Sequence, residues 1–465
     1  MQAVVQAHEI PYRDPLAAFY PFAGEPHALF LDSAQITDRL GRYSFIAVDP
    51  FLTMTSKDRQ IILGDEKIVG NPFEVLKAQL DQYRIAHRSG LPPFQTGAAG
   101  YFGYDLGHHI EDLPKARHDD MEFPDLMVGF YDLVIAFDHL QQRGWIMSSG
   151  FPEIDPIARK KRARVRIQGI LSKLADSPVN HPAPTAIAAP LKIESNFEDR
   201  GKYEAAVQQV IDYIYAGDIF QANLSQRFQA ELGPQDSPFK LYQRLRSINP
   251  APFAAYLDFE DVVIASASPE RFLLLRDNWV ETRPIKGTRP RGTTTESDQE
   301  FAAALLSSEK DRAENVMIVD LMRNDLSRVC QDNSVKTPEI CALESYATVH
   351  HLVSTVEGQL QPGKNALDLL QATFPGGSIT GAPKIRAMEI ITELEPTQRG
   401  PYCGSIGYIS FSGDMDTSIV IRTYAIKDNI VTFQAGGGIV ADSSPAAEYD
   451  ETLDKARALI NALGK

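Results

Sequence analysis

The chain has 465 residues, 43% of them hydrophobic and 23% charged, and a formal net charge of −15. This length and composition predict a soluble globular protein with about three domain-sized units. The excess of carboxylates argues against a nucleic-acid surface, because phosphate binding relies on clustered Lys and Arg, so an anionic ligand would need a local cationic pocket or a metal ion.

Short strand-like runs separated by Pro and Gly occupy about the first 150 residues. A basic helix is predicted next, over residues 155–176. We interpret its RKKRARVR run as a solvated helix face, because the chain as a whole is acidic. The stretch SPVNHPAPTAIAAP at residues 177–190 is rich in Pro and Ala, which predicts a linker.

Clearer periodicity follows the linker. Apolar residues at helical spacing predict a helix over residues 202–218 that ends at Gly217. The next run, IFQANLSQRF, alternates strictly between apolar and polar residues. It predicts a half-buried strand with Phe220 on the apolar face and the polar positions from Gln221 to Arg227 facing water.

A β-hairpin is predicted where Asp277 and Asn278 separate two apolar runs. A two-residue loop makes the numbers of opposing residues sum to 555, and a three-residue loop makes them sum to 556. Either register places Glu270 opposite Ile285 or Lys286. The acid and the lysine are therefore a candidate acid and nucleophile, although a cross-strand ion pair at a sheet edge explains the spacing equally well.

Two acidic helices are predicted in the C-terminal half. Asp311 and Glu314 share one face of the first, and Glu448, Glu451 and Lys455 form one stripe on the second. Carboxylates from two helices suit Mg²⁺, which commonly binds one or two of them together with water and substrate oxygens. Acidic stripes are also typical of solvated helix faces, so spacing alone leaves both interpretations open.

The cysteines and the glycine-rich stretches give no motif of their own. Cys330, Cys341 and Cys403 are odd in number and far apart, which indicates neither a disulfide framework nor a zinc site. We interpret PYCGSIGY, around Cys403, as a strand. FPGGSITGAPK and FQAGGGIVADSSP match neither a Walker A nor a dinucleotide motif and are predicted to be tight turns.

The N-terminus has no apolar signal region, and no apolar run is long enough to span a membrane. These features predict a reduced, cytoplasmic protein without a membrane segment.

Nine stretches, in order, resemble motifs of the chorismate-utilising enzyme family: GDIFQANLSQRF, ASPERF, RPIKGTRPRG, DLMRNDL, HLVSTVEG, PGGSITGAPK, GYIS, SIVIRT and AGGGIVADSSPAAEYDETLDKA. The resemblance implies an α+β fold of two large stacked antiparallel β-sheets with helices outside. It also implies three regions: an N-terminal region of the anthranilate synthase component I type at 1–176, a linker-like segment at 177–190, and a chorismate-binding catalytic region at 191–465.

The same resemblance implies that chorismate, a dianion, binds with a Mg²⁺ ion that joins its ring carboxylate to two glutamates. The residues matched to the metal ligands are Glu314 and Glu451, with Asp311 and Glu448 just outside them. The positions matched to substrate binding are Thr288, His351, Tyr408, Arg422, Gly436, Gly437 and Lys455. Mg²⁺, Arg422 and Lys455 would supply the local positive field that the acidic chain otherwise lacks.

Two positions separate the branches of the family. Isochorismate- and salicylate-forming members resemble one another in carrying a lysine base where this chain has Gln221, and an amide cannot deprotonate water. Anthranilate-forming members read P-I-A-G-T where this chain has Lys286. The lysine matches the aminodeoxychorismate-forming branch, in which it would attack C2 while Glu270 protonates the C4 hydroxyl, before ammonia enters at C4.

This match predicts an enzyme of the transaminating type in 4-aminobenzoate and folate synthesis. The alternative within the family is anthranilate formation for tryptophan synthesis. A non-catalytic sensor on the same fold would be expected to have lost site residues, yet every matched position carries a competent residue.

The predicted partners follow from the same resemblance. The chain has no amidotransferase nucleophile elbow, so ammonia would come from a separate glutamine amidotransferase subunit. The stretches FLDSAQ, RYSF and NPAPF resemble a pocket that binds L-tryptophan in the family, with Ser33, Pro250 and Phe253 at the matched positions. Asp32 departs from the glutamate that is usual in feedback-inhibited members. Neither a nucleic acid nor a membrane is an expected partner.

Overall fold

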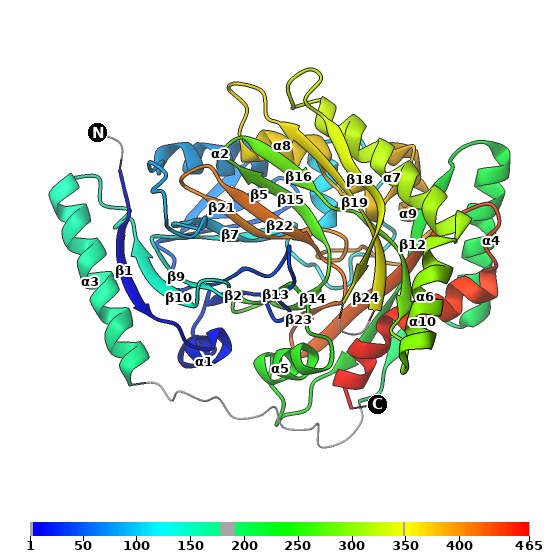
Figure 1. Ribbon diagram of the computed structural model, residues 1–465, viewed down its shortest axis with the longest axis horizontal. Coiled ribbons are helices and arrows are strands. Elements are labelled where there is room, and N and C mark those ends of the chain that lie inside the picture. The colour runs from blue at the N-terminus through cyan, green and yellow to red at the C-terminus, as the bar shows by residue number, and fades with distance from the viewer. Residues whose placement is uncertain (1–2, 177–190, 347–348, 465) are drawn as a thin grey trace.

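Two large antiparallel sheets lie face to face in the computed structural model, which describes residues 3–176, 191–346 and 349–464 (Figure 1). The first sheet contains, in spatial order, β1 (Gln6–Pro11), β10 (Arg143–Ser148), β9 (Leu133–Asp138), β3 (Tyr43–Ala47), β2 (Leu29–Asp32), β13 (Phe253–Asp258), β14 (Val263–Ser268), β23 (Thr423–Lys427), β24 (Ile430–Ile439), β12 (Gln221–Glu231) and β11 (Glu194–Ser195), with β20 (Gly381–Ala382) beside β12.

The second sheet has the same number of strands. It contains β17 (Ile285–Pro290), β19 (Val349–Gln359), β16 (Trp279–Thr282), β15 (Arg271–Arg276), β22 (Met415–Ile419), β21 (Ser405–Ser410), β7 (Gly97–Phe102), β8 (Leu126–Tyr131), β4 (Leu52–Lys57), β5 (Gln60–Leu63) and β6 (Glu66–Val69), with β18 (Lys336–Ser345) beside β19. The helices lie outside, so the predicted α+β fold class is confirmed.

Both sheets combine strands from distant parts of the chain. In the first sheet β2 pairs with β13, and in the second β7 pairs with β21 along its whole length. The N-terminal and catalytic regions named from the sequence therefore contribute to the same two sheets. The predicted linker at 177–190 lies outside the described residues.

Apolar side chains from the two inner faces form the central core. Phe45, Leu257 and Ile264 of the first sheet share one cluster with Tyr101 and Tyr131 of the second, and all five are buried. Sheets pack in this way when each strand directs alternate side chains toward the partner sheet.

Ten α-helices among the described residues cover the outer faces: α1 (Pro15–Phe19), α2 (Pro72–Gln82), α3 (Pro156–Ala175), α4 (Arg200–Ala216), α5 (Pro238–Ile248), α6 (Thr295–Leu306), α7 (Glu309–Ser327), α8 (Ala366–Thr373), α9 (Lys384–Leu394) and α10 (Pro445–Ala462). Helices α1, α3, α5 and α10 share a core with the first sheet, and α2, α7 and α8 share one with the second. Helix α4 ends at Gly217, with φ of 86°, as predicted.

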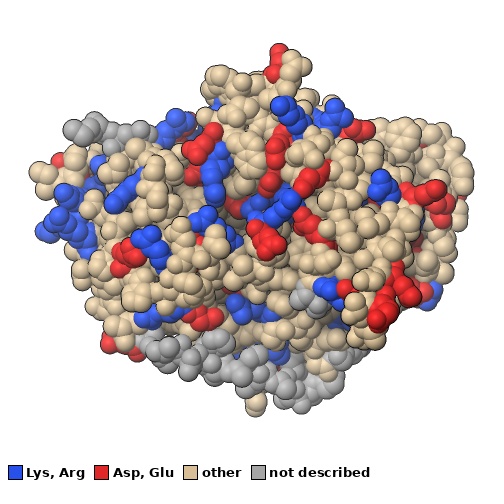
Figure 2. All heavy atoms as spheres, in the orientation of Figure 1, with Lys and Arg blue, Asp and Glu red and all other residues tan. Residues whose placement is uncertain are grey.

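The basic helix α3 is held to the sheet by its arginines. Arg166 Nη2 lies 3.0 Å from Asp132 Oδ1 and Arg162 Nε lies 3.4 Å from Oδ2, and Asp132 is fully buried. Cationic and anionic side chains are interspersed on the face that Figure 2 shows. No helix in the described ranges is both long and apolar enough to cross a membrane.

The predicted hairpin has the two-residue loop. Arg276 pairs with Trp279, which gives the sum of 555, and both loop residues have positive φ, as type I′ turns require. The hairpin ends at Thr282, however, and does not continue to residue 285 as predicted. Pro284 interrupts the ladder, and β17 pairs with β19 instead of β15.

Three further expectations from the sequence differ from the structure. The strand predicted for PYCGSIGY is present but begins only at Ser405, as β21, and Cys403, with φ of 63°, precedes it. The glycine-rich run FQAGGGI is not a tight turn but part of strand β24. The polar face of β12 is not solvated, because it lies over the buried ion pair of Glu395 and Arg399, whereas Phe220 is 71% exposed. Alternation in a single strand does not reveal what covers each face.

Candidate active site

Glu270 is a buried carboxyl at the start of β15, with 5% of its area exposed. Ser378 Oγ donates to its Oε1 at 2.6 Å, and the Ile285 N–H also stabilises the charged form. Burial outweighs these interactions and raises the pKa of Glu270 to about 7. The carboxyl is therefore about half protonated near pH 7 and mostly protonated below it.

Lys286 is the second residue of β17 and is partly buried. Burial lowers its pKa, and the positive charge of Lys455 acts in the same direction, although the carboxylates of Glu314 and Glu270 oppose the shift. A bulge follows directly, where Gly287 has φ of 80°. A Cβ there would lie 3.0 Å from Asp311, so the close approach of β17 to α7 requires glycine.

Carboxylates from two helices converge on the end of β24. A Cβ on Gly437 would lie 3.1 Å from both Glu448 Oε2 and Glu451 Oε1. Lys455 Nζ lies 2.6 Å from Glu451 Oε1 and donates to the Gly436 carbonyl at 2.8 Å. Glu314, on α7, is close to this group: burial raises its pKa, and the charge of Glu448 adds to the shift. The absent side chain at Gly437 leaves space beside the carboxylates.

The three carboxyl groups of this site differ in the direction of their pKa shifts. Burial raises the pKa of Glu314 and of Glu448, whereas partial burial of Glu451 is outweighed by Lys455, and its pKa is lowered. Lys310 Nζ lies 3.5 Å from Glu448 Oε1. Oxygen donors in a partly buried, anionic setting fit Mg²⁺. Across the described ranges no three His, Cys, Asp or Glu side chains form a metal site alone, so such an ion would need oxygens from substrate or water as well.

Thr288 and His351 face each other across β17 and β19, with Thr288 Oγ1 2.8 Å from His351 Nδ1. Burial lowers the pKa of His351 to about 3, and the nearby Arg422 contributes to the shift. The histidine is therefore neutral at physiological pH and can offer hydrogen bonds but no charge. Arg422 is partly exposed and its pKa is lowered by burial.

Gln221 approaches Lys286 from the first sheet. A Cβ on Gly438 would lie 1.8 Å from Gln221 Nε2 and 3.5 Å from Lys286 Nζ, so these three residues meet at one point. The buried Gln221 Oε1 has no hydrogen-bond partner among the described residues. Asp311 lies at the edge of the site and pairs with Arg289 at 3.1 Å.

Tyr408 does not lie with these residues. Its ring stacks on Phe94 at a centroid distance of 4.5 Å, and it lines a separate cavity of about 890 Å³ between the sheets. Ser33 and Phe253 line this cavity too, but Pro250 is not among its lining residues. The predicted substrate-binding tyrosine is therefore in the predicted tryptophan pocket.

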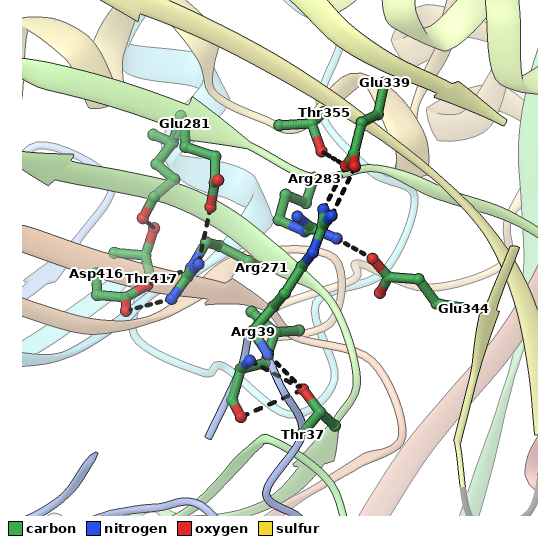
Figure 3. Close-up of polar contacts among 12 residues, drawn as sticks. Thr37, Arg39, Arg271, Glu281, Arg283, Glu339, Glu344, Thr355, Asp416 and Thr417 are labelled. Carbon is green, nitrogen blue, oxygen red and sulfur yellow. Dashed lines mark hydrogen bonds and ion pairs between the residues drawn. The ribbon is translucent and has the colours of Figure 1, made fainter. Parts of the chain in front are cut away.

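Ion pairs form one wall of this cavity (Figure 3). Arg271 pairs with Glu281 at 2.8 Å and with Asp416 at 3.0 Å, and Arg39 reaches across to Glu339. Asp32 also lines the cavity.

The carboxylate of Asp32 is already engaged. It accepts from Tyr242 Oη at 2.8 Å and from Arg246 Nε at 2.6 Å.

The model of the chorismate binding enzyme family matches residues 27–461. The chain belongs to this family. It is 42% identical to aminodeoxychorismate synthase component 1 of Escherichia coli (strain K12) over 462 residues, covering 98% of this chain and 97% of the relative. It is 40% identical to anthranilate synthase component 1 of Thermus thermophilus over 450 residues, covering 97% and 95%.

Solved structures agree with the fold of this chorismate binding enzyme. Anthranilate synthase component I from Streptococcus pneumoniae TIGR4 superposes with a TM-score of 0.80 and 34% identity, covering 98% of this chain and all of the other. The aminodeoxychorismate synthase relatives and the anthranilate synthase relatives have similar sequence identity to this chain. Overall similarity therefore does not distinguish between the two branches.

One contact in this chorismate binding enzyme was missed from the sequence. Ser378 lies in PGGSITGAPK, which we had predicted to be a tight turn, and it forms the 2.6 Å hydrogen bond to Glu270. The turn prediction is correct locally, because Gly377–Ile379 form a 3₁₀ turn, η3. No periodicity in such a segment indicates where a single hydroxyl points.

Proposed function

We propose that the chain forms 4-amino-4-deoxychorismate from chorismate and ammonia, as a cytoplasmic step in 4-aminobenzoate and folate synthesis. The observation that carries this proposal is the pair of Lys286, whose pKa is lowered, and Glu270, whose pKa is raised to about 7. A lowered pKa increases the fraction of neutral amine, which is the nucleophile, and a raised pKa keeps the acid protonated. Anthranilate-forming relatives are expected to need no lysine here.

The proposed chemistry exchanges a hydroxyl for an amino group. Neutral Lys286 Nζ attacks C2, the two conjugated ring double bonds each shift by one position toward C4, and the C4–O bond breaks as Glu270 gives its proton to the departing oxygen. Water leaves and Glu270 becomes a carboxylate. Ammonia adds at C4, both double bonds shift back, and the C2–N bond breaks to return a neutral lysine. The new ammonium group returns one proton to Glu270.

Other residues bind and orient the substrate in this proposal. Arg422 and Lys455 offer positive charge to its carboxylates, Thr288 and His351 line the ring, and the backbone at Gly436 and Gly437 supports the ring carboxylate. Glu314 and Glu451 would hold Mg²⁺, with Asp311 and Glu448 outside them. When bound, the ion would supply positive charge that favours binding of a dianion and departure of the hydroxyl.

Several relatives are named component 1, which supports the existence of a second component, and we propose that this is the glutaminase subunit that supplies ammonia. Anthranilate formation is the alternative function, because other relatives are named anthranilate synthase component 1.

Incubation of the purified chain with chorismate, Mg²⁺ and ammonium, followed by mass spectrometry, separates the two functions. We expect a product that retains the enolpyruvyl group. Anthranilate with release of pyruvate would overturn the proposal in favour of the alternative.

A further inference from the structure

Ser378 and Glu270 form a buried polar contact close to Lys286. Ser378 is 7% exposed and Glu270 is 5% exposed. The serine comes from the loop between α8 and α9, whereas the glutamate precedes β15. The 2.6 Å hydrogen bond from Ser378 Oγ to Glu270 Oε1 therefore joins two elements that are far apart in the sequence.

The loop that carries Ser378 is held in place on several sides. A Cβ on Gly377 would lie 2.6 Å from Leu321 Cδ2, so the turn packs directly on α7. Thr380 Oγ1 donates to the Gly376 carbonyl at 3.0 Å. At the end of the loop, Lys384 Nζ donates to Asp325 at 2.5 Å. These contacts fix the position of the Ser378 hydroxyl relative to the sheet.

We propose that Ser378 is a positioning residue that selects which oxygen of Glu270 carries the transferable proton. In a neutral carboxyl one oxygen carries the O–H, and the other, the carbonyl oxygen, is the stronger hydrogen-bond acceptor. Because Ser378 donates to Oε1, Oε1 is the accepting oxygen and the proton resides on Oε2. The inference rests on the proposed function, in which Glu270 gives that proton to the departing C4 oxygen and becomes a carboxylate.

Ser378 also affects how readily the proton leaves. The hydrogen bond from Ser378 is the interaction that most favours the ionised form of Glu270. Smaller contributions come from Lys286 on β17, the Ile285 N–H and Lys455 on α10. Burial raises the pKa of the Cys403 thiol, and the charge of Glu270 adds a smaller contribution. Loss of the Ser378 hydroxyl should therefore raise the pKa of Glu270 and leave its proton free to reside on either carboxyl oxygen.

Ser378→Ala tests this inference through the pH dependence of kcat. Glu270 must be protonated to act, so the rate falls on the alkaline side as it ionises. We expect this alkaline limb to move up by about one to two pH units, the shift that follows loss of a hydrogen bond to a charged group. We also expect kcat to fall by roughly tenfold or more, with little change in KM for chorismate. Ser378→Thr, which keeps the donor, should restore the limb.

Thr380→Val is the matched control, because it removes a buried hydroxyl of the same loop whose partners are the carbonyls of Gly376 and Gly377. Its alkaline limb should stay at the wild-type position. If Thr380→Val moves the limb as far as Ser378→Ala does, the effect belongs to the loop and the inference is wrong.

A second measurement does not depend on activity. In protein labelled with ¹³C at glutamate carboxyls, the Glu270 signal can be identified by its loss in Glu270→Gln and titrated by NMR. A higher pKa in Ser378→Ala supports the inference, even if the wild type makes anthranilate and the proposed function fails. An unchanged or lower pKa overturns the inference, even if the wild type makes aminodeoxychorismate.

Discussion

Lys455 Nζ lies 2.6 Å from Glu451 Oε1, one turn away on α10. Both side chains are nearly half exposed, at 43% and 47%, so this ion pair contributes little to folding stability. Its importance is electrostatic: Lys455 lowers the pKa of Glu451, whereas burial raises the pKa of Glu314 and of Glu448. Of the three carboxyl groups, Glu451 is therefore the one whose ionised form is favoured.

Substitution of either proposed metal ligand should abolish turnover without unfolding the protein. Glu314 and Glu451 lie on separate helices, so neither can replace the other. We expect Glu314→Ala and Glu451→Ala each to lower kcat/KM by at least about 100-fold, with thermal midpoints close to the wild type. Asp450→Ala, on an exposed position of α10, serves as the control and should stay active. Near-normal rates for either glutamate variant at low Mg²⁺ would rule out the assignment.

The nitrogen source should be ammonia alone. We expect the pure chain to turn over chorismate with ammonium salts and to be inactive with glutamine. Adding a separate glutaminase subunit should create the glutamine-dependent activity. Product assays with each nitrogen source measure this directly, and turnover of glutamine by the chain alone would show that a glutaminase site has been overlooked.

Lys286 should form a covalent adduct when ammonia is withheld. Chorismate and Mg²⁺ then supply everything except the second nucleophile, so the adduct should accumulate and be mapped by mass spectrometry to the peptide containing PIKGT. Lys286→Ala should lose the adduct and most of the activity. Lys286→Arg should do no better, because a guanidinium stays protonated. If Lys286→Arg is active and the wild type forms no adduct, then Lys286 contributes only its positive charge and is not a nucleophile.

The cavity between the sheets should bind L-tryptophan. It has about 890 Å³ of space, and Ser33, Phe253 and several charged side chains line it. Calorimetry should detect binding to the wild type and weaker binding by about tenfold to Phe253→Ala, which loses ring contact. The control is Phe220→Ala, at an exposed ring not among the cavity-lining residues. Absence of heat with the wild type would end this assignment.

Asp105 should make the protein less stable as the pH rises. Burial raises its pKa to about 7, against about 3.9 in an unfolded chain. The folded state thus retains a proton that the unfolded state has lost, so the stabilisation is complete below about pH 4 and disappears as pH rises through about 7. Asp105→Asn keeps an acceptor for the Gly400 N–H and should be more stable than the wild type at pH 8, by up to about 4 kcal/mol.

Urea unfolding at pH 5 and pH 8 measures this difference. Asp454→Asn, at an exposed position, controls for the loss of a charge. Equal stability of Asp105→Asn and the wild type at both pH values would contradict the prediction.

Local signals predicted much of the fold and part of the site. The loop at Asp277 and Asn278 fixed the hairpin register, because only a few residue types accept its backbone angles. That register brought Glu270 near residue 285, and the Ile285 N–H does stabilise its carboxylate.

Long-range packing decided what could not be predicted. The polar face of β12 is buried because a distant ion pair covers it, and Tyr408 faces the cavity because β21 lies beside β7. Ser378 meets Glu270 only through the arrangement of two separate elements. None of these contacts leaves a trace in the local pattern of one segment.

The pairing of β2 with β13 and of β7 with β21 has a consequence for how the protein is made. The partner of β7 is residues 405–410, about 300 residues later in the chain. At the usual rate of synthesis, this segment leaves the ribosome roughly 15–60 s after β7 does. β2 can pair once residues 253–258 have emerged, but this edge of β7 stays unpaired throughout that time, and open edges promote aggregation. The nascent chain therefore carries an exposed strand edge until part of its last third has emerged.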